Sequence, residues 1–206
     1  LFLTLVIAGV GIVLSLPIGI MLALGRRSKL PVVSLLSTIF IEIWRGVPLI
    51  TVLFMASNMF PLFMPEGVNF DKLMRALIGV MFFSAAYLAE VVRGGLQAMP
   101  KGQYEASQAA GLTYWKMMAL IILPQSLKVV IPAIIGSFIA LFKDTTLVLI
   151  IGLFDFLGII QFVGTNPDWL GFSHEGYVFA AAIFWVFCFG MSRYSQRLEK
   201  KLDTGN

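Results

Sequence analysis

The 206 residues are 59% hydrophobic and only 13% charged, whereas soluble domains carry roughly 25% charged residues. This composition excludes a water-soluble protein and indicates an integral membrane protein. The net charge of +4 does not indicate a nucleic-acid partner, because the basic residues are scattered in short loops, and the single cysteine, Cys188, excludes an internal disulfide.

Hydrophobic segments that are candidate membrane spans follow one another along the chain. They are residues 1–25, 31–63, 73–92, 129–152 and 176–191. The first lacks the charged start and the small-residue cleavage site of a signal peptide, so it is predicted to be a retained span. Whether further residues precede Leu1 is left open.

The second segment is too long for a single span and is interrupted by Glu42, Arg45 and Pro48. Because roughly 20 residues cross the hydrocarbon as a helix, we expect an interfacial helix first and the crossing after Gly46. Glu42 and Arg45 are three residues apart, so a local salt bridge between them, or an Arg45 side chain that extends to the membrane interface, is expected rather than contact of Arg45 with substrate.

Lysine and arginine residues are divided unequally between the two sides of the predicted spans. Eleven follow the first span, lie within residues 93–128 or follow the last span, whereas Lys72 and Arg75 lie on the other side. The positive-inside rule therefore predicts a cytoplasmic C-terminus, a cytoplasmic 93–128 loop and an outer N-terminus. No fixed-period repeat and no linker is visible, so residues 1–206 are predicted to form one all-α transmembrane domain of about five helices.

The 93–128 loop carries its own helix start and stop signals. Pro100 and Gly102 open a first helix, and Gly111 stands where a left-handed residue ends it. Thr113 can cap a second helix, which we expect to end at Pro124. Each helix is too short to be stable alone in water, so both must pack on something.

A longer pattern in this loop resembles a known signature. Glu105-Ala106-Ser107, Gly111 and Ile121-x-Leu123-Pro124 are similar in type and spacing to the EAA motif of ATP-binding-cassette importer permeases, with Ser107 in place of the second alanine. The alternative is that Glu105 only complements the helix dipole. The resemblance implies two coupling helices that dock on ATPase subunits, with these coupling residues: Gly102, Glu105, Ala106, Ser107, Gly111, Leu123 and Pro124.

The rest of the chain resembles the polar amino-acid permeases (His/Glu/Gln/Arg/opine) within that family. Residues 41–49 (IEIWRGVPL), 85–94 (AAYLAEVVRG), 100–103 (PKGQ) and 143–147 (KDTTL) match its elements, with Val47 where threonine is usual. In detail the chain is most similar to the M-type permease of general L-amino-acid importers.

This resemblance implies a type I importer fold in a bacterial inner membrane. It also implies three kinds of partner: a second permease (a paralogue or a copy of this chain), two ATP-binding subunits and a periplasmic amino-acid-binding protein. The chain lacks the phosphate loop G-x-x-x-x-G-K-[ST], so ATP and magnesium are expected on the partner subunits and no cofactor or metal on this chain.

Charged and polar side chains inside the spans are candidates for a substrate path, because each charge costs a few kcal/mol there. Lys143 and Asp144 suggest a break between half-helices, where Asp144 suits a substrate ammonium and Lys143, or a helix start near Thr145, suits its carboxylate. An equal alternative is that both charges hold subunits together. The candidate path residues are Glu42, Asn58, Tyr87, Lys143, Asp144 and Thr145.

Other functions are disfavoured by the residues themselves. An intramembrane protease or hydrolase needs paired aspartates, a nucleophile with its base or a zinc motif in the spans, and none is evident. An ion channel would need a symmetric filter and would give the two-helix loop no purpose. A permease for a related small polar solute, such as an opine, stays open.

Overall fold

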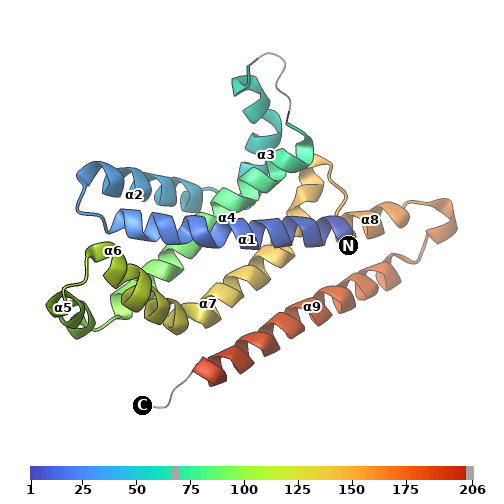
Figure 1. Ribbon diagram of the computed structural model, residues 1–206. Helices are drawn as coiled ribbons and strands as arrows, with labels where there is room; N and C mark the ends of the chain where they lie inside the picture. The colour runs from blue at the N-terminus through green and yellow to red at the C-terminus, as the bar shows by residue number, and fades with distance from the viewer. Residues whose placement is uncertain (66–69, 203–206) are drawn as a thin grey trace.

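The computed structural model describes residues 1–65 and 70–202, and all regular secondary structure in these residues is helical (Figure 1). The predicted all-α class is therefore confirmed. The long helices are α1 (Phe2–Arg26), α4 (Lys72–Ala98), α7 (Leu123–Asp144) and α9 (Ser173–Leu202). The shorter elements are α2 (Pro31–Gly46), α3 (Leu49–Asn58), η1 (Phe60–Phe63), α5 (Lys101–Ala109), α6 (Tyr114–Met117), the π-turn η2 (Met118–Ile122), η3 (Thr145–Ile151), α8 (Phe156–Val163) and η4 (Pro167–Trp169).

Four helical stretches are long and apolar enough to cross a membrane. They are Phe2–Arg26, Lys72–Ala98, Tyr114–Ile151 and Ser173–Leu202. The helices α2 and α3 pass the same test only together, and their axes are bent by 102°. The expectation of about five spans agrees with this arrangement if the bent pair is one broken span.

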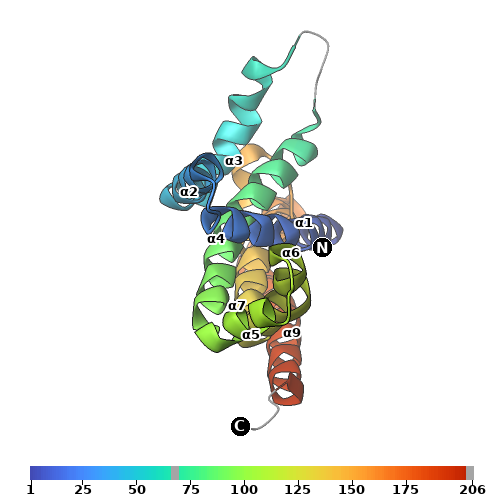
Figure 2. The ribbon, with the colours of Figure 1, turned by 60° about the vertical axis from the view of Figure 1, so that its left-hand side comes forward.

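The second hydrophobic segment breaks where the sequence indicates, at Val47 and Pro48. Val47 is extended, with φ −111° and ψ 133°, as the residue before a proline usually is, and α3 begins directly afterwards. α2 lies along α1, whereas α3 is bent away from the axis of α2 and packs on α4 and η3 (Figures 1 and 2). The interfacial position of α2 stays a prediction. The Ser34 hydroxyl donates to the Arg26 carbonyl at 3.0 Å and so closes the α1–α2 hairpin.

Small residues let the central helices approach closely. A Cβ at Gly19 of α1 would stand 2.9 Å from the Leu88 Cβ and 3.1 Å from the Ala85 carbonyl oxygen on α4. A Cβ at Gly95 of α4 would stand 2.6 Å from the Ser126 carbonyl oxygen on α7. Such small-residue contacts are how helices pack tightly in lipid, where the hydrophobic effect does not drive association.

Pro124 does not end a helix, which corrects the prediction from the sequence. The chain is helical without interruption from Tyr114 to Ile151, and the π-turn η2 lies just before Pro124. A wider turn at this point accommodates the missing N–H and the ring of the proline, as π-bulges commonly do. The predicted loop 93–128 is therefore shorter, because α4 extends to Ala98 and α7 begins at Leu123.

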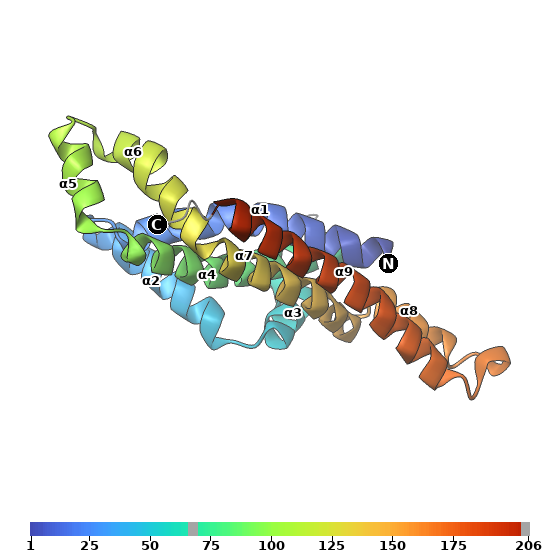
Figure 3. The ribbon, with the colours of Figure 1, turned by 90° about the horizontal axis from the view of Figure 1, so that it is seen from below.

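The segment after η3 forms a helix, α8, that the sequence did not reveal. Asp155 is fully buried and caps α8, with its Oδ1 accepting from the Gly158 N–H at 2.8 Å. The Phe156 N–H donates to the Thr4 hydroxyl at 3.0 Å, which attaches α8 to the first turn of α1. Figure 3 shows α8 and the N-terminus at one end of the molecule and α5 with α6 at the other.

Candidate functional site

The helix–glycine–helix segment projects from one end of the bundle, and we call residues 101–117 the knob (Figure 3). Gly111 is left-handed (φ +73°), as predicted, and ends α5 with two bonds. The Gly111 N–H donates to the Gln108 carbonyl at 2.9 Å and the Leu112 N–H to the Ser107 carbonyl at 3.1 Å. This is a Schellman ending, which fixes the direction of the chain into α6.

The outer surface of the knob is open. Gly102, Glu105, Ala106 and Gly111 are exposed, and a Cβ at either glycine would meet no atom within 4 Å. Trp115 is 71% exposed and lies edge-on to Tyr114, with ring centres 5.4 Å apart. A large exposed aromatic pair is typical of a protein contact surface, and the sequence analysis does not single it out.

The inner surface of the knob is packed and hydrogen-bonded. Ser107 is buried and donates to the Gln103 carbonyl at 2.6 Å, so it faces inward, unlike the other predicted coupling residues of α5. Leu123 lies against a buried cluster in which Val92 and Leu96 of α4 meet Met117, Met118 and Ile122, while Pro124 is exposed. Thr113 precedes α6, as predicted, but its side chain makes no cap bond.

Charged side chains from α1, α2 and α4 gather around Glu90, in the half of α4 that leads into the knob. Arg93, three residues further along α4, donates to Glu90 Oε2 at 2.7 Å, and Arg26 of α1 bonds Glu90 Oε1. Glu42 pairs with Arg26 at 2.9 Å, so the expected Glu42–Arg45 bridge is wrong. Arg45 instead approaches Glu90 Oε2 at 3.9 Å.

A polar cavity of about 250 Å³ lies between α1, α4 and α7. It brings together Tyr87 and Asp144, two of the predicted path residues, although they are far apart in the sequence. Three serine side chains line the cavity with them. The polar lining residues are Ser15, Ser84, Tyr87, Ser137 and Asp144.

The other predicted path residues lie elsewhere. Lys143 is exposed and does not line the cavity, and Glu42 belongs to the cluster around Glu90. Asn58 is exposed at the end of α3, where its Nδ2 donates to the Phe54 carbonyl at 3.1 Å. Thr145 is buried next to Asp144 but is not among the lining residues.

The expected break into half-helices after Asp144 is also wrong. The backbone continues from α7 directly into the 3₁₀ helix η3, so no new helix start faces the cavity. The hydroxyls of Thr145 and Thr146 donate to the carbonyls of Phe142 and Lys143, at 2.8 and 2.9 Å. These bonds lie where the helix tightens from the α form of α7 to the 3₁₀ form of η3.

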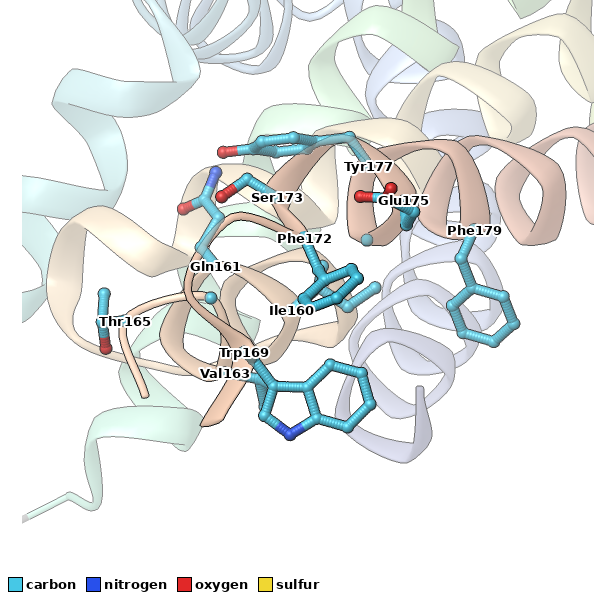
Figure 4. Close-up of a pocket in the computed structure, with 12 residues that line it drawn as sticks. Ile160, Gln161, Val163, Thr165, Trp169, Phe172, Ser173, Glu175, Tyr177 and Phe179 are labelled. Atoms are coloured by element: carbon cyan, nitrogen blue, oxygen red, sulfur yellow. The ribbon is translucent and has the colours of Figure 1, made fainter. Parts of the chain in front are cut away.

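A larger cavity, of about 680 Å³, lies between α8 and the start of α9 (Figure 4), at the end of the molecule away from the knob (Figure 3). Trp169, Phe172 and Tyr177 lie around it, with Glu175 and Gln161 as polar neighbours. It shares no lining residue with the cavity at Asp144. It is therefore a separate surface feature.

Comparison with known proteins adds a family to this geometry. A family described as "Binding-protein-dependent transport system inner membrane component" matches residues 15–204. The chain is 65% identical over 205 residues to the inner membrane amino-acid ABC transporter permease protein YhdY of Escherichia coli, covering 100% of the chain and 56% of YhdY. It is 56% identical to the glutamate/glutamine/aspartate/asparagine transport system permease protein BztC of Rhodobacter capsulatus, covering 97% of the chain and 46% of BztC.

The chain therefore spans about half the length of these two relatives. A shorter relative, the probable amino-acid ABC transporter permease protein YckA of Bacillus subtilis, is 33% identical, with 96% of the chain and 85% of YckA covered. Among solved structures, an amino acid ABC transporter with histidines superposes with a TM-score of 0.84 at 28% identity, over 98% of this chain and 91% of that one. The fold is that of an ABC importer permease, and the chain belongs to the family of binding-protein-dependent transport system inner membrane components.

Proposed function

We propose that this chain is a permease subunit of an ATP-driven, binding-protein-dependent amino-acid importer. It forms half of the translocation path and passes the movement of ATPase subunits to its spans. The observation that carries this proposal is the knob, whose outer surface is open while its inner surface is fastened to α4. The names of the similar permeases support amino acids as the cargo and favour them over an opine.

The partners follow from this role. Two cytoplasmic ATP-binding subunits would hold ATP and magnesium, a second permease would complete the path, and a periplasmic binding protein would deliver the amino acid. The second permease would be a paralogue rather than a copy of this chain. The distribution of lysine and arginine supports an inner-membrane orientation in which the knob and the C-terminus are cytoplasmic.

The knob would dock through its exposed residues. Gly102, Glu105 and Ala106 present the first turns of α5, and Gly111 sets the angle at which α6 leaves it. Ser107 would contribute only from within, because it is buried and bonded to Gln103. A push on the knob would then reach α4 through the packed cluster and α7 through the continuous helix that starts at Tyr114.

The cavity at Asp144 would hold the ammonium group of the substrate. A half-buried carboxylate in a cavity that is also lined by hydroxyl groups favours a cation that can donate several hydrogen bonds. Ionisable groups at this depth of a span are functional candidates because of their cost. Lys143 has no part in this proposal, since it is exposed outside the cavity.

The decisive experiment is reconstitution of the complete importer in vesicles, with uptake of a panel of labelled amino acids and ATP hydrolysis measured together. The wild type should show uptake that needs both ATP and the binding protein. In Gly111→Val, a β-branched side chain at φ +73° costs roughly 1–3 kcal/mol of local strain and misdirects α6. ATP hydrolysis should continue while uptake per ATP falls.

Gly190→Val is the matched control, because a Cβ at Gly190 of α9 meets no atom within 4 Å and its φ is not positive. It should transport like the wild type. Normal coupling in Gly111→Val would refute the role of the knob. Uptake that needs no binding protein would refute the importer proposal as a whole.

A further inference from the structure

The polar cavity offers a partner for a substrate's ammonium group but none for its carboxylate. Asp144 is its one ionised group, beside hydroxyls of serines and of Tyr87, and none of its lining residues is basic. Lys143, the residue expected to bind the carboxylate, is exposed outside it. An amino acid held here would leave its carboxylate unpaired in a site within the spans, which is strongly unfavourable.

The cluster around Glu90 holds one positive charge more than it holds negative charges. Three arginines, Arg26, Arg45 and Arg93, meet two glutamates, Glu42 and Glu90. Both oxygens of Glu90 are bonded at short range by Arg26 and Arg93, and Glu42 is paired with Arg26. Arg45 approaches only to 3.9 Å, beyond hydrogen-bond distance, so it carries the excess charge.

This arginine is not itself a lining residue of the cavity, but it lies beside one of them, Tyr87. Its guanidinium carbon lies 5.7 Å from the centre of the Tyr87 ring, and Tyr87 lines the cavity with Asp144. The Arg45 side chain is 35% exposed, so it is not locked by packing, and it belongs to the last turn of α2, directly before the bend at Pro48. Its nearest anion is Glu90 Oε2 at 3.9 Å, and Arg26 and Arg93 already bind that carboxylate at shorter range.

We propose, on the basis of the function proposed above, that Arg45 binds the carboxylate of a zwitterionic amino acid whose ammonium group is held by Asp144. The planar guanidinium presents parallel N–H groups that fit a carboxylate with two hydrogen bonds. A site that binds both the α-ammonium and the α-carboxylate group accepts α-amino acids as a class. The substrate's side chain would then be recognised by other parts of the importer.

The test is direct binding to the permease–ATPase complex in nanodiscs, without the binding protein. The probe is labelled L-glutamine, whose side chain is neutral, and the competitor is L-glutaminamide, which keeps the ammonium group but lacks the carboxylate. The wild-type complex should prefer L-glutamine by about tenfold or more, the usual range for one charged pair. Arg45→Gln should bind L-glutamine about tenfold more weakly and lose the preference over the amide.

Arg93→Gln is the matched control, because it removes an arginine of the same cluster that does not approach Tyr87, and it should keep the preference. Arg45→Met, which keeps an apolar stem, serves if Arg45→Gln fails to assemble. Unchanged preference in either Arg45 variant, or equal loss in Arg93→Gln, would overturn the assignment of Arg45. ATP-driven uptake by the wild type tests the importer proposal separately, so the two can fail independently.

Discussion

Arg27 at the end of α1 donates a hydrogen bond of 3.3 Å to the Tyr104 hydroxyl on α5, and its guanidinium lies 5.8 Å from the centre of the Tyr104 ring. Both side chains also donate to the Leu96 carbonyl of α4, at 3.1 and 3.2 Å. One tyrosine thus fastens α5 to both α1 and α4. The first span therefore shares any displacement of the knob.

Tyr104→Phe should loosen this attachment without changing the packing of the ring. It removes the hydroxyl that Arg27 and Leu96 share, for a loss of about 1 kcal/mol in the free energy of unfolding. Uptake per ATP hydrolysed should fall, because α5 can then move without α1. Both quantities are measured on the reconstituted complex, with Tyr194→Phe, an exposed tyrosine of α9, as the control. Equal coupling in the two variants would show that the Tyr104 hydroxyl transmits nothing.

Gly19→Val should destabilise the bundle. The added side chain would press against the backbone and Cβ atoms of Leu88 and Ala85, and overpacking of this kind costs roughly 1–3 kcal/mol. Gly9→Val, on the same helix but with open space around its Cβ, should have little effect. Thermal unfolding in detergent compares them, and equal melting temperatures would contradict the close approach of α1 and α4.

Glu90→Gln should be far more harmful than Glu42→Gln. Glu90 is the shared partner of Arg26, Arg93 and Arg45, and its side chain is 16% exposed, so neutralising it leaves several positive charges poorly paired, at a cost of about 3 kcal/mol. The Glu42 side chain is 54% exposed and has one partner, so its loss should cost at most about 1 kcal/mol. Yield and thermal stability of the purified complex decide between these outcomes, and the reverse order would refute Glu90 as the centre of the cluster.

Asp144→Asn should reduce uptake by at least about tenfold, because the neutral amide cannot pair with the substrate's ammonium group. The complex should still assemble and dock its ATPase subunits, since the knob is far along the chain from this residue. Lys143→Gln is the neighbouring control, because that side chain is exposed outside the cavity. If the two variants transport alike, Asp144 has no role in binding.

Local signals in the sequence were sufficient to predict several features. Gly111 and Pro48 dictate the backbone around them, and Glu90 with Arg93 needs only helical spacing to form a pair. Each membrane span can likewise be predicted from one apolar segment, because only the length and composition of that segment decide whether it can cross the bilayer. In all these cases the deciding neighbours lie within a few residues in the chain.

The errors concern contacts between distant residues. Arg26 lies 64 residues before Glu90, so helical spacing favoured a Glu42–Arg45 pair that the fold replaces with Arg26. Pro124 signals a helix end in isolation, but the π-turn before it, packed against α4, lets the helix continue. The cavity at Asp144 depends on three helices meeting, which no single segment of sequence records.

The approach of Gly95 to the Ser126 carbonyl has a mechanical consequence. The helices that lead into and out of the knob are in backbone contact there, so they cannot come any closer at this point when the knob is pushed and would pivot about it. Beyond this fulcrum the same two helices carry Tyr87 and Asp144 on facing walls. A small tilt of α4 and α7 at the knob would thus change the distance between their other ends, and with it the width of the cavity proposed to hold the substrate.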